Sequence, residues 1–463
     1  MPTLKQISTV AILAMLTLPT AADTTWVAAG NVSGVWTVEG SPYMVNQGDI
    51  YIPNGDCLLI TPGVEILLSD SMSIMVEGSL QAVGTEIDSV RFDNYEPSYR
   101  WGHIVFYYAD SCKLEYCVFE RASGFTGMWP QDVGGAMEIY QTNMNIKHCS
   151  YRYCWAFYGG GAIDFNYSTC MIDSCSFFDN QSGINDGGAI YSLFSDLNFT
   201  NCIFDHNQGG TDGGAICSIF GSLLINYCLF DANTTSQGGG AITTGSDEVT
   251  ITNSTFYDNG GNSSSNQIEI NGSQTNIHNC IISKTDDGEF ALYLDNPQSI
   301  NISNCCFDSN EVDLYCYSMP QLGQVVTVNS NGDSCDIYSN LFMNTLMNAP
   351  WDGDFSLQEE SPCIDAGSLS LQYDPDGTIS DIGRYYYDQT PETLNPIIAV
   401  IDNDIRLNWN AIPNALQYNV YIGGEPYFEL ATAQQDVTTD TFFIDSDVIS
   451  EGSRFYKVTI VTE

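Results

Sequence analysis

A short pattern of glycine, alanine and isoleucine recurs along the middle of the chain. Each copy begins with Gly-Gly-Ala, and the copies start at Gly134, Gly160, Gly187, Gly213 and Gly239. Successive copies are therefore 26, 27, 26 and 26 residues apart, and four of the five continue with isoleucine. A fixed period of this size is the sequence signature of a repeat protein in which each unit is one turn of a solenoid.

A second motif runs beside the first and predicts the shape of each unit. It has an aliphatic residue at position −3, a cysteine at position 0 and an aromatic residue at +2, as in Ile172, Cys175 and Phe177. Positions 0 and +2 share one face of a strand because side chains alternate, whereas position −3 is out of phase, so the chain must bend between −3 and 0. Asparagine tolerates the left-handed conformation of a sharp bend, and it stands at −1 in four units, at Asn201, Asn253, Asn279 and Asn304. The pattern predicts two or three short strands per unit, joined by tight bends.

The repeat predicts an all-β fold, a right-handed parallel β-helix over residues 23–345. A unit of about 26 residues cannot bury its apolar face alone, but stacked units bury a continuous core. Five units also carry asparagine three residues after the aromatic residue, at Asn180, Asn207, Asn233, Asn259 and Asn310. The Gly-Gly-Ala-Ile and Phe-x-x-Asn repeats, best formed over residues 114–310, resemble those of bacterial polymorphic outer-membrane and adhesin-like proteins and of the wider pectin-lyase-like β-helix class. The resemblance implies a secreted or surface-displayed protein.

Residues 346–390 break the repeat. The stretches from Ser361 to Gly367 and from Asp374 to Gly383 resemble the segment that closes many secreted bacterial β-helices, so we expect residues 346–390 to cap the last coil. Asp374, Asp376 and Asp381 are candidate Ca²⁺ ligands, because this ion prefers hard oxygen ligands around a glycine turn. The alternative is a set of Asx turns without a metal.

Residues 395–463 change to a period-two alternation of apolar and polar positions. This stretch resembles a fibronectin type III module, and Trp409, Tyr418 and Tyr456 stand where that family places core aromatic residues. Such β-sandwiches have about 100 residues, so we expect this one to lack the final strand, either as a shortened domain or with its edge paired to a neighbour. We expect a small, shortened β-sandwich that acts as a spacer or interaction module.

Residues 1–22 have the form of a secretory signal peptide. Lys5 precedes an apolar stretch from Ile7 to Leu18, and Thr20, Ala21 and Ala22 are small residues suited to cleavage. No later apolar stretch reaches the roughly 20 residues that a membrane span requires. The sequence predicts a secreted or cell-surface protein without a membrane span after removal of the signal.

The charge balance excludes several partners. The chain has 12 Lys+Arg against 57 Asp+Glu, which gives a formal net charge of −45. Binding to nucleic acid requires basic residues at the phosphates, and an anionic membrane surface attracts the same residues. Acidic polysaccharides are also repelled unless Ca²⁺ intervenes.

The 16 cysteines are predicted to be mainly free, buried thiols. Position 0 of stacked units would place cysteines close together, but their side chains point in parallel, which gives poor disulfide geometry. Free cysteine also packs well as a small apolar group. Among the cysteines outside this column, four are candidates for bridges of unknown pairing: Cys57, Cys316, Cys335 and Cys363.

The candidate ligand site lies around the longest insertion, residues 123–133. The ligand-binding candidates are Arg100, Trp101, Arg121, Phe125 and Trp129, because exposed aromatic residues beside charges suit a sugar. The alternative is a loop packed over the coils. No catalytic residue is assigned, since the repeat aspartates recur in successive units whereas a catalytic group of residues should be local.

The sequence therefore favours binding or adhesion without catalysis, with an extracellular polysaccharide or a surface protein as partner. No cofactor is required, although Ca²⁺ is a candidate ligand. The alternative is a polysaccharide lyase or glycoside hydrolase. The resemblance to the pectin-lyase-like class implies this alternative, because enzymes of that class act on polysaccharides.

Overall fold

The computed structural model describes residues 24–461 except residues 97–99, 125–132, 185–186, 262–265, 273, 286–289, 296–297, 311, 317, 370–372, 390–395, 402–403, 411–415, 424–433 and 447–453. The predicted signal peptide, residues 1–22, lies outside the described residues. The chain divides into two compact units, Met1–Tyr387 and Asp388–Glu463.

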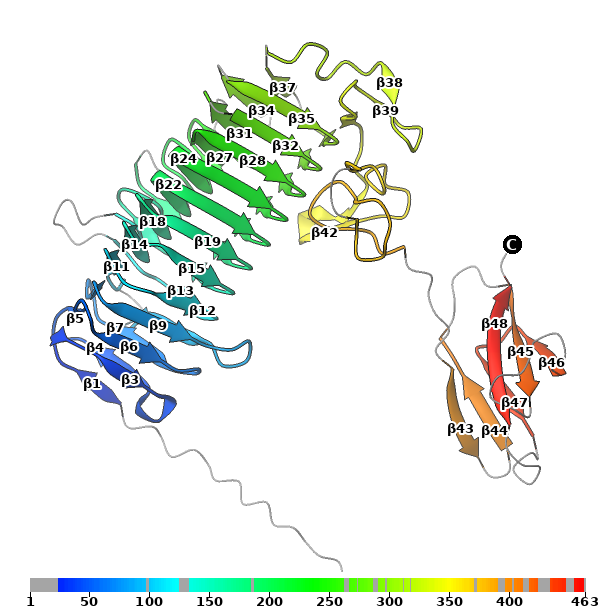
Figure 1. The fold of residues 1–463 in the computed structure, drawn as a ribbon, viewed down its shortest axis with the longest axis horizontal. Coiled ribbons are helices and arrows are strands. Elements are labelled where there is room, and N and C mark those ends of the chain that lie inside the picture. The colour runs from blue at the N-terminus through cyan, green and yellow to red at the C-terminus, as the bar shows by residue number, and fades with distance from the viewer. Residues whose placement is uncertain are drawn as a thin grey trace, which may run out of the picture. The chain divides into compact units, whose positions relative to one another are not determined.

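The first unit is the predicted parallel β-helix, and it is built on two long sheets (Figure 1). Sheet 1 has 15 strands, in the order β1 (Thr25–Val27), β4 (Tyr43–Val45), β7 (Glu65–Leu68), β10 (Val90–Asn94), β13 (Cys117–Glu120), β16 (Ser150–Arg152), β20 (Ser176–Phe178), β23 (Ile203–Asp205), β25 (Leu229–Asp231), β29 (Thr255–Tyr257), β33 (Ile281–Ser283), β36 (Cys306–Asp308), β40 (Leu341–Phe342), β39 (Ser334–Cys335) and β38 (Thr327–Val328).

Sheet 2 has 21 strands and takes two strands, or one long bent strand, from most coils. In chain order these are β2 (Gly30–Asn31), β3 (Gly34–Trp36), β5 (Ile50–Ile52), β6 (Cys57–Ile60), β8 (Ile74–Val76), β9 (Ser79–Val83), β11 (Ile104–Tyr107), β12 (Lys113–Glu115), β14 (Met137–Tyr140), β15 (Met144–Lys147), β18 (Ile163–Asn166), β19 (Thr169–Asp173), β22 (Ile190–Thr200), β24 (Ile216–Asn226), β27 (Gly239–Gly245), β28 (Glu248–Thr252), β31 (Asn266–Asn271), β32 (Gln274–His278), β34 (Phe290–Asp295), β35 (Ser299–Ser303) and β37 (Val312–Tyr315). Two short pairs complete the coils, β17 (Trp155–Ala156) with β21 (Gln181–Ser182) and β26 (Thr234–Thr235) with β30 (Gly260–Gly261). One 3₁₀ turn, η1 (Val38–Gly40), lies in the first coil.

Like residues stack on like residues between the coils. The aromatic residue at +2 forms a buried column in sheet 1, in which Phe177 is in register with Phe204 and Phe204 with Phe230. Ring centroids of neighbouring members lie 4.7 Å apart with interplanar angles of 4° and 6°. The column extends from Phe92 to Phe256, so one repeated residue type builds a continuous core.

The bend predicted before position 0 is confirmed. The residue at −1 has a positive φ in eight units, at Tyr116, His148, Ser174, Asn201, Tyr227, Asn253, Asn279 and Asn304. Tyrosine, histidine and serine therefore also adopt the left-handed conformation here, because the stacked coils fix the bend whatever residue occupies it.

The glycine pair of the repeat is required by close contact between neighbouring coils. A Cβ atom on Gly188 would lie 2.0 Å from the carbonyl oxygen of Gly214, and one on Gly214 would lie 1.9 Å from that of Gly240. No side chain fits at such distances. The Gly-Gly-Ala turns thus stack backbone on backbone, which explains the constant spacing of the repeat.

The asparagine after each aromatic residue forms a buried hydrogen-bonded ladder. The side-chain nitrogen of Asn207 donates to Oδ1 of Asn233 at 2.9 Å and to the carbonyl of Phe177 at 2.9 Å. Asn180 and Asn233 make the same pair of bonds one coil away. Both donors of each amide are thus satisfied inside the core, as a buried polar group requires.

The position-0 cysteines are free and buried, as predicted, and all 16 cysteines are free. The Sγ atom of Cys149 donates to the carbonyl of Lys147 at 3.2 Å, and that of Cys280 donates to the carbonyl of His278 at 3.2 Å. The four candidates for bridges, Cys57, Cys316, Cys335 and Cys363, form no bridge in this structure. Cys57 is exposed, whereas Cys335 and Cys363 are buried together with Cys306.

The segment after the repeats packs on the side of the solenoid. It contains the hairpin of β41 (Met347–Ala349) and β42 (Asp354–Leu357) around the 3₁₀ turn η2 (Pro350–Asp352). Phe355, Leu357 and Ile382 bury the outward side chains of Tyr257 and Ile281 in sheet 1. Further packing against the last coils comes from Met319, Leu322 and Phe342. We expected residues 346–390 to close the last coil. Instead, this segment packs along the side of several coils.

The second unit is a small pair of antiparallel sheets. One sheet contains β43 (Ile397–Ile401), β44 (Asp404–Asn408) and β47 (Phe442–Asp445), and the other contains β46 (Gln434–Thr438), β45 (Gln417–Gly423) and β48 (Phe455–Val461). Its core consists of Leu407, Trp409, Tyr418 and Val420, against which Tyr456 packs. The three predicted core aromatic residues are thus in or against the core, while the kinship with fibronectin type III modules stays a prediction.

Candidate functional site

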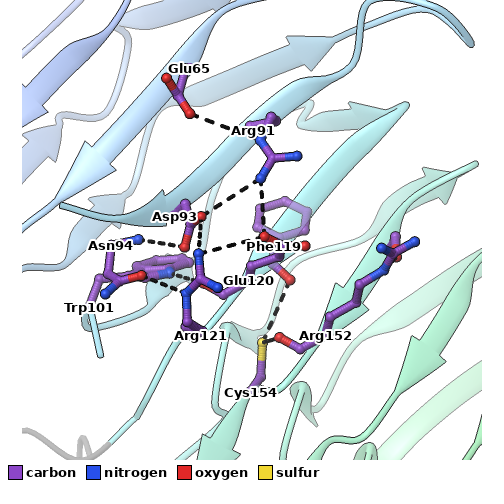
Figure 2. A network of polar contacts seen from close by, with 11 residues as sticks. Glu65, Arg91, Asp93, Asn94, Trp101, Phe119, Glu120, Arg121, Arg152 and Cys154 are labelled. Carbon is purple, nitrogen blue, oxygen red and sulfur yellow. Dashed lines mark hydrogen bonds and ion pairs between the residues drawn. The ribbon is translucent and has the colours of Figure 1, made fainter. Parts of the chain in front are cut away.

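The predicted arginine and tryptophan site is a network of ion pairs on strands β7, β10 and β13 of sheet 1 (Figure 2). Nη2 of Arg121 lies 2.5 Å from Oδ2 of Asp93, and its Nε donates to Oδ1 of Asn94 at 2.8 Å. Nη2 of Arg91 lies 3.1 Å from Oε2 of Glu120. The charges of this network thus neutralise one another on adjacent coils.

Asp93 is a buried carboxylate of this network that depends on its ion pair. Burial raises the pKa of Asp93, while the backbone N–H of Asn94 and the charge of Arg121 lower it. A buried carboxylate of this kind needs its cation, because removing one partner of a buried ion pair leaves an uncompensated charge. Arg121 is therefore held by the solenoid itself, with its Nε and one Nη engaged.

Trp101 lies in the same network but is not exposed. Its indole is fully buried, and Nε1 donates to the carbonyl of Glu120 at 2.7 Å. Nη1 of Arg100 donates to the backbone carbonyls of Ala122, at 3.3 Å, and Tyr153, and burial lowers the pKa of Arg100. The expectation of an exposed sugar platform at Trp101 is wrong, because its ring fills the core. Phe125 and Trp129 lie outside the described residues.

A different set of aromatic residues is exposed on the solenoid. We call it the aromatic row, and it lies at the bend between the two strands that each coil gives to sheet 2. Its members are the exposed residues Tyr107, Tyr108, Tyr167, Phe194 and Phe220 and the half-buried Tyr140, whose ring contacts those of its neighbours. Tyr167 is 49% and Phe194 45% exposed, although large apolar side chains prefer the interior.

The rings of the aromatic row follow the coils. Tyr167 and Phe194 stack with centroids 5.2 Å apart, and Phe194 and Phe220 stack at 4.6 Å. The ring centroids of Tyr140 and Tyr167 lie 6.0 Å apart at an interplanar angle of 69°, so this pair is edge-to-face and the parallel stacking is interrupted there. A bulky residue in the left-handed conformation is unusual, yet Tyr167, Phe194 and Phe220 have φ values of 51°, 52° and 60°.

The sequence contains a signal for this row. Tyr167, Phe194 and Phe220 each stand seven residues after the first glycine of a Gly-Gly-Ala copy. Aromatic residues at a constant offset within a solenoid repeat lie in one column. Only their exposure required the structure.

One carboxylate on sheet 2 has a strongly raised pKa. Burial raises the pKa of Glu138 to about 7. Glu138 is in register with Asp164 on the adjacent strand, so two acidic residues are neighbours there, as in the carboxylate pair that a glycosidase uses. Asp164, however, is 1% exposed, and a Cβ on Gly134 or Gly159 would touch its side chain. Because Asp164 lies beneath these turns, the pair does not present two carboxylates to a substrate.

The repeat aspartates of sheet 1 form two neighbouring columns rather than one stripe. Asp205 and Asp231 are in register, and burial together with the charges of Asp205 and Asp258 raises the pKa of Asp231 to about 7. Nζ of Lys284 lies 2.5 Å from Oδ2 of Asp258. The columns thus repeat along the rod, as expected of a structural feature.

The three predicted calcium ligands lie in the flanking segment. Asp381 accepts the backbone N–H groups of Asp365 and Tyr387, both at 2.7 Å, and Asp374 accepts that of Asp381 at 2.8 Å. Oδ1 of Asp376 accepts the N–H and hydroxyl of Thr378, at 3.0 and 2.7 Å. Among the described residues, no three histidine, cysteine, aspartate or glutamate side chains are arranged to hold a metal ion. Calcium binding by these aspartates stays a prediction.

Comparison with known proteins supports the fold. A family profile for the right handed beta helix region matches residues 73–256, which is less than half of the chain. No curated protein and no solved structure matches the chain. Within the described residues no helix has the length and apolar character needed to cross a membrane. Residues 73–256 are thus similar to right-handed β-helix proteins and contain the whole aromatic row and, except for Glu65, the ion-pair network.

Proposed function

We propose that this β-helix protein is a secreted or cell-surface binding protein that holds a neutral polysaccharide along the aromatic row. The observation that carries the proposal is the row itself, which places six large rings, five of them exposed, on five successive coils. Contiguous exposed apolar surface marks interaction sites. A row that repeats at the coil spacing suits a partner that also repeats, namely a polymer.

The charge of the chain restricts the polymer. A formal net charge of −45 repels polyanions, so the partner is neutral or basic. Stacked rings cover one another's faces and expose mainly their edges, together with the tyrosine hydroxyls. Each sugar unit then makes a weak contact, and the affinity comes from several contacts in sequence along the same chain.

Catalysis receives less support than binding. In the described residues, the carboxylate of Asp164 is covered and the arginines at 91 and 121 are engaged with carboxylates. A general acid or base must reach the proton it transfers. Adhesion to a surface protein is the other class of partner, and it is distinguished by the same experiment.

The experiment measures retention of the full chain, after removal of residues 1–22, on insoluble neutral polysaccharides such as cellulose, xylan and a β-1,3-glucan. The triple variant Tyr167→Ala/Phe194→Ala/Phe220→Ala is expected to lose about tenfold or more in affinity, the equivalent of about 1.4 kcal/mol. Tyr153→Ala is the matched control, because Tyr153 is 50% exposed and also has a positive φ but lies outside the row.

Three outcomes decide between the candidates. Retention that depends on the row and not on Tyr153 supports the proposal. No retention on any polysaccharide, or equal loss in both variants, overturns it and leaves protein adhesion as the function to test. New reducing ends in the incubated polymer overturn it in favour of a glycoside hydrolase or lyase.

A further inference from the structure

A cavity of about 310 Å³ lies between the flanking segment and the side of the solenoid. We call it the flank cavity. The solenoid contributes Asn201, Tyr227 and Asn253, which are three successive members of the bend column before position 0. The flanking segment contributes Tyr373, Asp374, Ser380, Asp381, Arg384 and Tyr386. The volume is at the lower end of the range for small-molecule sites.

Direct hydrogen bonds fix both walls of the flank cavity. Nη1 of Arg384 donates to the carbonyl of Cys202 at 2.5 Å, and its backbone N–H donates to the hydroxyl of Thr255 at 3.0 Å. The side-chain nitrogen of Asn279 donates to Oγ of Ser380 at 3.0 Å. The walls are therefore preorganised, which lowers the cost of ordering them around a ligand.

The flank cavity offers polar groups that the fold does not use. Oδ2 of Asp374 accepts the N–H of Asp381 at 2.8 Å. Within the part of the chain that the structure describes, Oδ1 of Asp374 and the hydroxyl of Tyr227 have no hydrogen-bond partner. Both oxygens of Asp381 are occupied by backbone N–H groups. An incoming ligand thus meets one carboxylate oxygen and a phenol, which bind hydroxyl groups well.

The aromatic rings and the charge define the class of ligand. Tyr373 and Tyr386 are 58% and 41% exposed, and their rings supply apolar surface at the rim. The lining holds the guanidinium of Arg384 as well as the carboxylates of Asp374 and Asp381, so a strong anion is not favoured and the cation site is partly compensated. We infer that the flank cavity binds a single neutral sugar unit, whose hydroxyls bond to Asp374 and Tyr227 and whose C–H surface packs on Tyr373 and Tyr386.

This inference rests on the proposed function in taking a saccharide as the ligand, but it concerns a separate bend of the coil. The aromatic row lies between the two strands that a coil gives to sheet 2, whereas the flank cavity lies between sheet 2 and sheet 1. The row would hold the length of a polymer, and the cavity would hold one unit or a chain end. Variants of the two sites are therefore independent.

The test titrates the full chain with the methyl glycosides of glucose, galactose, mannose and xylose, in the presence of EDTA, by saturation-transfer NMR and calorimetry. Asp374→Asn and Tyr373→Ala are each expected to weaken binding about tenfold or more, which corresponds to about 1.4 kcal/mol. Tyr373→Phe, which keeps the ring, is expected to bind like the wild type. Trp351→Ala is the control, since Trp351 is an exposed aromatic residue of the same segment outside the cavity.

The outcomes separate this inference from the proposed function. Glycoside binding that survives Tyr167→Ala but not Tyr373→Ala supports the flank cavity, whatever the polymer does. The inference is overturned if no methyl glycoside binds, or if binding is lost in Trp351→Ala and not in Tyr373→Ala. Neither result bears on the proposed function of the aromatic row. Binding of glucosamine or glucuronate in preference to the neutral glycosides also overturns it. Unchanged melting temperatures show that the variants remain folded.

Discussion

The hydroxyl of Ser254 accepts a hydrogen bond from the backbone N–H of Cys228 at 3.0 Å. It also donates to the carbonyl of Thr252 at 2.7 Å. The thiol of Cys175 makes the equivalent pair, accepting from the N–H of Cys149 and donating to the carbonyl of Asp173, both at 3.4 Å. Position 0 thus requires a small side chain that donates and accepts, and sulfur is one way to supply it.

Substitution at position 0 separates hydrogen bonding from packing. Ser254→Ala leaves a buried N–H and a buried carbonyl without their partner, which costs about 1–3 kcal/mol in the free energy of unfolding. Ser254→Cys restores the pattern of the other coils and is expected to cost less than half as much. Urea unfolding, followed by the loss of β-structure in circular dichroism, measures both. Equal destabilisation by the two variants would show that size alone matters here.

The repeat unit was predictable because its reasons are local. Gly188 and Cys175 recur at a fixed spacing, and each has the same surroundings in every coil, so a pattern of one unit defines the whole solenoid. Ile172 at position −3 is out of phase with Phe177 at position +2, and this mismatch was enough to predict the bend that the structure has at Ser174. Each stacked coil repeats the same local contacts, so no long-range contact has to be predicted separately.

The site was less predictable because its contacts join distant parts of the chain. Trp101 looked like a surface residue beside an insertion, but the carbonyl of Glu120 satisfies its indole inside the core. Tyr227 and Asp374 meet at the flank cavity although they are far apart in sequence. The position of residues 346–390 depends on the outward side chains of Tyr257 and Ile281, and no periodicity encodes that contact.

The glycine turns provide a sharp test of the coil packing. Gly188→Ala places a methyl group 2.0 Å from the carbonyl oxygen of Gly214, so the coils must separate. Overpacking with backbone displacement costs about 1–3 kcal/mol or more, and a lower melting temperature is expected. Gly245→Ala is the control, since the nearest atom to its new methyl group is 3.9 Å away. A similar melting temperature for both variants would contradict this account of the repeat spacing.

The thiols should differ strongly in their reactivity. Cys57 is exposed and Cys316 is partly exposed, whereas the other 14 of the 16 cysteines are buried. Burial also raises the pKa of Cys154 and Cys170 to about 12, and thiolates are the reactive form. A maleimide reagent on the native protein is therefore expected to label Cys57 first and Cys316 more slowly, with full labelling only after unfolding. Mass spectrometry of the labelled peptides checks the order, and rapid labelling of the position-0 column would show that the coils open.

The dependence of stability on pH should reflect Glu138. Its pKa is raised by burial from an ordinary value of 4.5 to about 7, so the folded protein binds this proton more tightly than the unfolded chain. The stabilisation is complete below about pH 4.5 and is lost as the pH rises through about 7, with an upper limit of about 3 kcal/mol for this one group. Asp231 and Asp381, whose pKa values are also raised to about 7 by burial, act in the same direction.

Glu138→Gln isolates the contribution of that carboxyl, because the amide is neutral at every pH and has the shape of the protonated acid. We expect the variant to be more stable than the wild type at about pH 8 and close to it at about pH 5, since the charged form is disfavoured only above its raised pKa. Glu248→Gln is the control, because Glu248 is exposed at the start of β28 and should leave the pH profile unchanged. Melting temperatures measured across this pH range provide the comparison. A Glu138→Gln profile parallel to that of the wild type would show that Glu138 is ionised in the folded protein, and that water reaches its carboxylate.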